Sequence, residues 1–302
     1  MPPEMRFPSE LEPESASARL FSRRNFMLGA AAASGLALYA GEFARHEIDV
    51  VNLTMRIRNL PEAFHGFRIV QISDIHLQEF TEPLFLERVI HRINSIPCDI
   101  VLLTGDYVCR TPLPKSYARR QAGVCGELLR RIACPQRYGI LGNHDIDVGE
   151  AAVKDALETT GTPILNNRYL PIERGGQRIW LCGLRDPTSG GARIEESVPR
   201  RPDGPVIVMV HEPDYLDVML TDPASRSIDL VLSGHSHGGQ VRIPGLPPLT
   251  LPPGAEKYYE GLYRFGDLQL YVNRGIGTVG LPFRLFCPPE ITVFTLQPHG
   301  LV

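Results

Sequence analysis

Five short polar motifs in this sequence combine histidine with aspartate, asparagine and glycine. In chain order they read SDIH (73–76), GD (105–106), GNHD (142–145), HEP (211–213) and GHSHGG (234–239). Imidazole nitrogen, carboxylate oxygen and amide oxygen together suit Zn²⁺, Mn²⁺ and iron ions. A carboxylate can bridge two ions about 3.5–4 Å apart, which clamp a phosphoryl group and turn water into a hydroxide nucleophile. One such motif is a weak signal, but five in one chain indicate a metal centre.

Each motif follows an apolar run with the character of a buried β-strand. These runs are FRIVQIS, DIVLLT, RYGIL, PVIVMV and DLVLS, at residues 67–73, 99–104, 137–141, 205–210 and 229–233. Runs that are apolar on both faces fit strands buried inside a layered α/β protein. In such folds ligands collect at the carboxyl ends of the strands, where loops converge. We therefore expect the five motifs to meet at one site.

The remaining sequence supplies the elements between and after these strands. Helical spacing predicts helices over 83–94 and 149–160, and an alternating pattern predicts an edge strand over 48–57. A hairpin with a turn at Gly175 and Gly176 and two late strands, within 268–275 and 290–296, complete the pattern. Strands that alternate with helices imply a largely parallel arrangement. We expect one mixed α/β sandwich.

In this order, the five motifs between Phe67 and Gln240 resemble the calcineurin-like metallophosphoesterase superfamily. The continuation GHSHGGQVRIPG, YVNRGIGTVGLPFR and CPPEI is similar to a branch of exported bacterial phosphodiesterases. Some relatives in that branch hydrolyse the pyrophosphate of UDP-2,3-diacylglucosamine. The resemblance implies a four-layer α/β fold, with a mixed β-sandwich of two sheets flanked by helices, and hydrolase activity on phosphoester bonds.

The resemblance also implies roles for individual residues. Two divalent metal ions, Mn, Zn or Fe, would share Asp106 as a bridge. The ligands of one ion would be Asp74, His76, Asp106 and His237, and those of the other Asp106, Asn143, His211 and His235. His144 would be the catalytic residue that stabilises the transition state or protonates the leaving oxygen. Asp145 would orient His144 or cap the next turn, and the glycines of GHSHGG would let the backbone approach the phosphate.

One position departs from two subfamilies of this superfamily. The protein Ser/Thr phosphatases carry an aspartate three residues after the bridging aspartate, and the purple acid phosphatases carry an iron-binding tyrosine there. This chain has Cys109 at that position, and Tyr107 lies too close to Asp106 to replace the tyrosine ligand. Both subfamilies are therefore disfavoured.

Candidate substrate contacts come from arginines and from an apolar loop. Arg274 and Arg284 are expected to hold phosphate oxygens, as guanidinium groups do well. The loop from Leu246 to Leu251, with Phe283, Leu285 and Phe286, would contact a lipid or acyl chain or form covered core.

The N-terminal residues 1–45 read as a twin-arginine export signal or an N-terminal anchor, which leaves 46–302 as the phosphoesterase domain. Ser22-Arg23-Arg24-Asn25-Phe26 precedes an uncharged apolar stretch that ends at Gly41. We expect export by the twin-arginine machinery to the periplasm or the outer face of the cytoplasmic membrane, with membrane association if the segment is retained. The net charge of −3 argues against a nucleic-acid partner. The six cysteines lack metal-binding spacing and are expected to be mostly buried thiols.

Together these features predict a two-metal phosphoesterase that acts on a phosphodiester or pyrophosphate of the cell envelope, with a lipid-linked or nucleotide-linked substrate. One alternative is a UDP-2,3-diacylglucosamine hydrolase of lipid A synthesis. That precursor is handled at the cytoplasmic face, so a functioning export signal counts against it. A non-catalytic scaffold without metals is disfavoured, because the full set of ligands is present.

Overall fold

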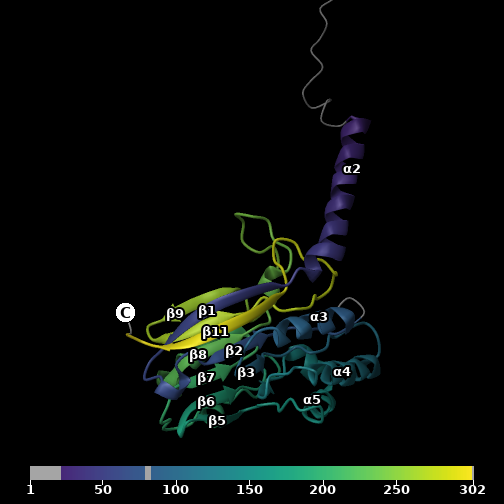
Figure 1. Ribbon diagram of the computed structural model, residues 1–302. Coiled ribbons are helices and arrows are strands. Elements are labelled where there is room, and N and C mark those ends of the chain that lie inside the picture. The colour runs from purple at the N-terminus through teal and green to yellow at the C-terminus, as the bar shows by residue number, and fades with distance from the viewer. Residues whose placement is uncertain (1–21, 79–82, 301–302) are drawn as a thin grey trace, which may run out of the picture.

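Two β-sheets pack face to face in the computed structural model, which describes residues 22–78 and 83–300 (Figure 1). Within these residues the first sheet has the strand order β1-β11-β2-β3-β4, with bounds Asp49–Ile57, Glu290–Pro298, Arg68–Ile72, Ile100–Leu103 and Arg137–Gly139. The second sheet has the order β5-β6-β7-β8-β10-β9, with bounds Arg168–Arg174, Gln177–Gly183, Val206–Met209, Ile228–Ser233, Leu268–Val272 and Gly261–Phe265. The predicted sandwich of two sheets is confirmed.

Helices cover the outer face of each sheet, so the fold has four layers. The first sheet is covered by α3, α4 and α5, with bounds Pro83–Asn94, Lys115–Leu129 and Asn143–Glu158 (Figure 1). The second sheet is covered by the short helices α6 and α7, with bounds Ile194–Ser197 and Leu216–Met219, and by irregular chain. One helical layer is therefore much thicker than the other.

Alternation along the buried strands builds three apolar clusters between these layers. In β2, Val70 and Ile72 face the helices, whereas Ile69 faces the second sheet. The second sheet contributes Ile207 and Leu230 to the cluster between the sheets. Burial of apolar surface on both sides explains why these strands read as continuous apolar runs.

The strands that precede the polar motifs run parallel within each sheet. In the first sheet β2, β3 and β4 are parallel, and in the second β6, β7 and β8 are parallel. The edge strand β1, the β5–β6 hairpin and the late strands β10 and β11 also lie where the sequence predicts them.

The predicted helices differ from the structure at two places. The helix over 83–94 is confirmed by α3, but α5 begins at Asn143 rather than at 149 and is interrupted at Gly149, whose φ is 142°. The helix α4 was not predicted. All six cysteines are free, four of them buried and two, Cys98 and Cys134, half-buried.

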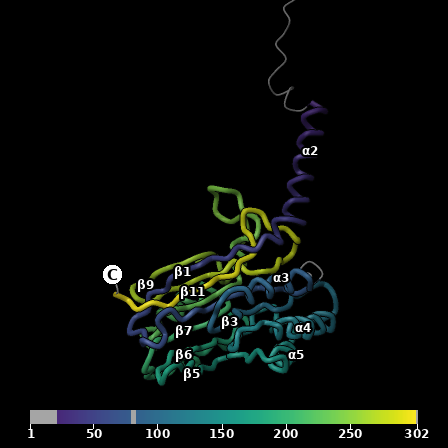
Figure 2. Tube along the Cα trace, in the orientation of Figure 1, coloured from purple at the N-terminus to yellow at the C-terminus, as the bar shows by residue number. Residues whose placement is uncertain are grey.

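The N-terminal helix α2, Arg23–Leu38, stands away from the sandwich (Figures 1 and 2). Its first turn is capped by Ser22, whose Oγ accepts the Asn25 backbone N–H at 3.2 Å. No residue of α2 is buried. The helical segment from Arg23 to His46 is long and apolar enough to cross a membrane. The division at residue 45 and the export signal itself stay predictions.

Candidate metal centre

The predicted ligands come together from the carboxyl ends of strands in both sheets. Asp74 and His76 follow β2, Asp106 follows β3 and Asn143 follows β4, while His211 follows β7 and His235 and His237 follow β8. The backbone takes a left-handed conformation at five of these residues, with φ from 46° to 68°, at Asp74, His76, Asp106, His235 and His237. This conformation is unfavourable for residues other than glycine and persists at functional sites where the surrounding structure enforces it.

One cluster consists of Asp74, His76 and His237. The Nε2 atoms of the two histidines are 3.1 Å apart, and Oδ1 of Asp74 lies 3.5 Å from Nε2 of His237 and 3.7 Å from Nε2 of His76. Because all three side chains are buried, this crowding of nitrogen and oxygen donor atoms suits a cation between them.

A second cluster consists of Asp106, His211 and His235. His211 donates from Nδ1 to the carbonyl of Thr104 at 2.7 Å, so its Nε2 keeps a lone pair, 3.2 Å from Oδ2 of Asp106. His235 donates from Nε2 to the carbonyl of Pro253 at 3.0 Å, which leaves its Nδ1 as the available ligand atom. The two backbone carbonyls therefore fix which nitrogen each histidine offers.

Asp106 reaches both clusters. Its Oδ2 lies 3.5 Å from Nε2 of His76 and 3.2 Å from Nε2 of His211. Nε2 of His211 and Oδ1 of Asn143 are buried and form no hydrogen bond with any described residue. Orphaned buried acceptors are rare unless something else satisfies them. The donor set thus fits two cations bridged by Asp106.

Electrostatics also favours positive charge at this site. Burial alone would raise the pKa of Asp106, but the neighbouring His211 and His144 outweigh it and hold that pKa well below its usual range. Burial alone would lower the pKa of His211, but Asp106 outweighs it and holds that pKa well above its usual range. The Asp106 carboxylate is therefore ionised, and its negative charge favours a cation beside it, either a proton on His211 or a metal ion.

His144 is oriented by the backbone at the first turn of α5. Its backbone N–H donates to Oδ1 of Asp106 at 3.0 Å, and its Nδ1 accepts the Arg110 backbone N–H at 2.9 Å. Because Nδ1 is the acceptor, the neutral ring carries its proton on Nε2. Cys109 lies beside the same Nδ1, with its Sγ at 3.6 Å. Nε2 of the neutral ring can thus donate a hydrogen bond, and His144 lines the cavity described below.

Asp145 caps α5 and joins two loops rather than touching His144. One carboxylate oxygen accepts the Gly142 N–H at 3.0 Å, which closes the helix N-terminus. The other accepts the N–H groups of Tyr107 and Val108 at 2.9 and 3.2 Å. Of its two predicted roles, the structure supports the cap.

The glycine that opens GHSHGG allows close packing of the protein itself. A Cβ at Gly234 would lie 1.9 Å from Oγ of Ser73 and 2.3 Å from Oδ2 of Asp74. The same carboxylate accepts the His235 backbone N–H, at 2.9 Å through Oδ2. Gly234 therefore lets the two sheets meet at the metal centre, whereas the sequence suggested an approach to phosphate.

Neither predicted substrate arginine reaches the cavity. Arg284 is fully buried and donates to the carbonyls of Arg274, Gly275, Gly277 and Cys287. Arg274 pairs with Glu290 at 2.5 Å and Asp49 at 2.7 Å. The structure thus corrects the expectation of phosphate contacts: both guanidinium groups hold loops of the chain. Nη2 of Arg284 also lies 3.4 Å from Nδ1 of His237.

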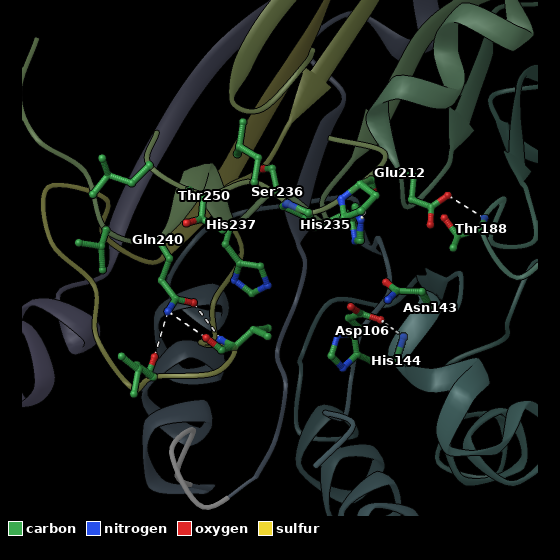
Figure 3. Close-up of a pocket in the computed structure, with 18 of the residues that line it drawn as sticks. Asp106, Asn143, His144, Thr188, Glu212, His235, Ser236, His237, Gln240 and Thr250 are labelled. Atoms are coloured by element: carbon green, nitrogen blue, oxygen red, sulfur yellow. Dashed lines mark hydrogen bonds between the residues drawn. The ribbon is translucent and has the colours of Figure 1, made fainter. Parts of the chain in front are cut away.

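A cavity of about 770 Å³ opens over the metal centre (Figure 3). Asp106, Asn143, His144, His235 and His237 line its inner side. Its other wall is mostly apolar and consists of Val241, Leu249, Leu251, Pro252, Pro253, Val279, Leu281 and Phe283, with polar Gln240 and Thr250. The cavity thus pairs a polar centre with an apolar wall.

Thr188, Glu212 and Gln240 are among the polar residues of the cavity to which the sequence assigned no role. Oε2 of Glu212 accepts the Thr188 N–H at 2.9 Å, and burial together with the nearby Asp186 raises the pKa of Glu212 to about 7. Gln240 is bonded to the backbone of Val279 in both directions. The position of Glu212 directly after His211 was the available signal for that residue.

A match to a family model identifies the protein family in which this site occurs. The model of the calcineurin-like phosphoesterases matches residues 67–239, which contain all five motifs. The chain belongs to this family. Members of the family use divalent metal ions, and the chain is accordingly a phosphoester hydrolase with candidate metal-binding clusters.

Curated relatives cover most of the chain. It is 36% identical to the uncharacterized metallophosphoesterase YkuE of Bacillus subtilis, over 91% of this chain and 98% of that protein. It is 31% identical to the phosphodiesterase YaeI of Escherichia coli, over 76% of this chain and 82% of that protein. It is 27% identical to the UDP-2,3-diacylglucosamine pyrophosphatase LpxG of Chlamydia muridarum, over 83% of this chain and 91% of that protein.

Proposed function

We propose that the chain is a two-metal phosphoesterase that hydrolyses a phosphodiester or a pyrophosphate of the cell envelope. The observation that carries this proposal is the convergence of two buried ligand clusters on Asp106, beneath a cavity that His144 also lines. Bound there, two divalent ions would supply Lewis acidity and lower the pKa of water toward neutral.

The ligand side chains form two groups, one for each ion. Asp74, His76 and His237 would hold one ion, and Asn143, His211 and His235 the other, with Asp106 between them. Mixed nitrogen and oxygen ligands suit Mn²⁺, Zn²⁺ and iron. The carbonyls of Thr104 and Pro253 keep His211 and His235 in the ligating tautomers.

His144 would supply the proton that the leaving oxygen needs. With Nδ1 engaged by the Arg110 N–H, only Nε2 is free to donate. Burial alone would lower the pKa of His144, but the nearby Asp106 outweighs it and raises that pKa above its usual value. The raised pKa favours the cationic ring, which forms when Nδ1 takes a proton in place of the Arg110 N–H, and Nε2 of this form would be the general acid.

Charge in the cavity favours a diester over a monoester. No lysine or arginine is among the described residues that line it. The metal ions alone would balance the phosphate charge, and a singly charged diester needs less compensation than a doubly charged monoester. The relative named as a phosphodiesterase agrees with this preference. The relative named as a pyrophosphatase is what keeps a pyrophosphate in the proposal.

A second candidate is hydrolysis of UDP-2,3-diacylglucosamine. It is supported by the relative of that name and by the apolar cavity wall, which suits an acyl chain. An exported enzyme would not meet this precursor at the cytoplasmic face. We propose export through the twin-arginine machinery because Arg23 and Arg24 begin an exposed apolar helix, with residence at the outer face of the cytoplasmic membrane.

Substrate class is tested by assaying the full chain with Mn²⁺, Zn²⁺ or Fe²⁺ on three compounds. These are p-nitrophenyl phosphate, bis(p-nitrophenyl) phosphate and UDP-2,3-diacylglucosamine. We expect the diester to be cleaved faster than the monoester, and His235→Ala to abolish cleavage while His65→Ala, an exposed histidine outside the site, leaves it unchanged. Preference for the monoester, or full activity of His235→Ala, would contradict the proposal.

A further inference from the structure

We infer that the outer rim of the cavity is a membrane-contacting surface, which α2 holds against a lipid bilayer so that the cavity opens into the head-group layer. The rim consists of five exposed apolar side chains, Ile243, Leu246, Leu249, Leu281 and Phe286. The consequence for substrate choice rests on the proposed phosphoesterase function, whereas the contact with lipid does not.

The helix α2 has the character of a membrane anchor rather than of a surface helix. From Asn25 to Gly41 the chain carries no charged side chain, and no residue of α2 is buried in the protein. A helix that is apolar on all sides requires an apolar environment around it. At 1.5 Å per residue, the 16 residues of α2 extend about 24 Å, enough to insert through most of a hydrocarbon core of about 30 Å.

The base of this helix is fixed to the loop that carries part of the rim. Ala40, Gly41 and Ala44 lie buried at the domain surface. A Cβ at Gly41 would lie 2.9 Å from the ring of Phe283, and the Arg284 backbone N–H donates to the Ala40 carbonyl at 3.1 Å. The loop from Leu281 to Phe286 therefore lies where the helix leaves the domain.

The second rim loop rises on the same side of the molecule. Figures 1 and 2 show the green loop after β8 projecting from the sandwich on the side from which α2 leaves it, with the yellow loop before β11 at the base of the helix, and the Arg242 N–H of the green loop donates to the Leu285 carbonyl of the yellow loop at 2.9 Å. The green loop carries Ile243, Leu246 and Leu249, which are 46%, 51% and 64% exposed. A bilayer that surrounds α2 would meet this loop before the rest of the domain.

The same two loops form the apolar wall of the cavity. Leu249 and Leu281 belong to the rim and also line the cavity, followed inward by Leu251 and Phe283. An apolar path thus runs from the exposed rim to the metal centre. Large exposed apolar patches mark interaction surfaces, and continuity with a lipid-embedded helix assigns this one to a bilayer.

This geometry selects an amphiphilic phosphoester as substrate. Its phosphate would reach the metal centre while its apolar part stays along the wall between Leu249 and Phe283. The substrate would need only to rise partway out of the membrane, so its acyl chains would not have to enter water.

Fluorescence quenching tests the contact with lipid. The full chain is reconstituted in vesicles of phosphatidylcholine and phosphatidylglycerol with brominated acyl chains, in a Trp180→Phe background because Trp180 is the only tryptophan. Leu246→Trp reports the rim, Leu36→Trp reports α2, and Tyr169→Trp on β5 is the control at a strand that lies far from α2 in Figure 1. We expect strong quenching at 36 and 246 and little at 169. Quenching at 246 no greater than at 169, or none at 36, would overturn the inference.

Hydrolysis tests the consequence for substrate choice. Leu246→Glu/Phe286→Glu is compared with Val218→Glu/Leu220→Glu, whose side chains are similarly exposed and lie outside the rim. The substrates are bis(p-nitrophenyl) phosphate in solution and a diacyl phospholipid with a p-nitrophenyl phosphodiester head in vesicles. We expect only the rim variant to lose at least about tenfold in rate, and only on the vesicle substrate, since one charge at the bilayer interface already weakens such contacts.

The two assays separate this inference from the proposed function. Equal loss on both substrates, or no loss on either, would overturn the role of the rim. If the unaltered chain with added metal cleaves neither compound, the phosphoesterase proposal fails. The quenching pattern still decides the lipid contact in that case.

Discussion

Gly142→Ala should disable the metal centre while the protein still folds, because the backbone conformation at this position suits alanine. Gly142 has φ −99° and ψ −179°, an extended conformation that alanine adopts freely. An added Cβ, however, would lie 2.2 Å from Oδ1 of Asp106 and 2.7 Å from Nε2 of His211. Ordinary contacts begin near 3.4 Å, so the Asp106 carboxylate must move by roughly 1 Å.

The size of the effect follows from that displacement. A misplacement of about 1 Å at a reacting centre costs roughly 10²-fold in rate. We therefore expect kcat/KM for bis(p-nitrophenyl) phosphate to fall about 100-fold, which corresponds to about 2.7 kcal/mol of transition-state stabilisation. Bound metal should fall as well, because Asp106 and His211 both lie against the new methyl group.

The assay combines steady-state kinetics, metal analysis and thermal unfolding. Gly123→Ala is the matched control, because a Cβ at this position in α4 would have no atom within 4 Å. It should leave kcat/KM unchanged and stabilise the fold by about 0.5–1 kcal/mol. If Gly142→Ala keeps both normal metal content and normal kcat/KM, the geometry assigned to Asp106 is refuted.

Three further changes have distinct expected outcomes. His144→Gln should lower kcat by about 10²–10⁴-fold on alkyl diesters and much less on p-nitrophenyl esters, whose leaving group needs no proton; equal loss on both would exclude a general acid. Raising the pH through the Glu212 pKa of about 7 adds negative charge to the cavity, so KM should rise above pH 7, and Glu212→Gln should abolish that rise. Arg284→Lys should lower the thermal midpoint and metal affinity at constant KM, because each carbonyl left unpaired in the core costs about 1–3 kcal/mol; a change confined to KM would restore Arg284 as a substrate contact.

The positions of the metal ligands could be predicted because all of them except Asn143, which follows the edge strand β4, come after strands that are buried on both faces. Such strands leave a strong apolar signal, and parallel strands bring their carboxyl ends together. The sequence could not show which histidine nitrogen faces the centre. That choice depends on the carbonyls of Thr104 and Pro253, the first 107 residues from His211 along the chain.

The incorrect predictions concern α4 and two arginines, whose structural roles depend on residues that are distant in the sequence. The glycines in α4 weaken its helical pattern, yet Gly126 is where α4 and α5 approach, with a Cβ there only 2.6 Å from the Ala156 carbonyl. Arg274 and Arg284 read as free loop cations, but Glu290, Asp49 and four backbone carbonyls neutralise or bond them. The local sequence cannot identify these partners, because only the folded structure brings them into contact.

Metal stoichiometry tests most directly whether two ions share Asp106. The full chain and Asp106→Asn are equilibrated with Mn²⁺, freed of excess ion and analysed for metal per chain, with exposed Asp267→Asn as the control. We predict two ions per chain for the unaltered protein and for Asp267→Asn. Asp106→Asn should retain one ion or fewer while circular dichroism shows an intact fold. Two tightly held ions in Asp106→Asn, or fewer than two in the unaltered chain, would contradict the bridged centre.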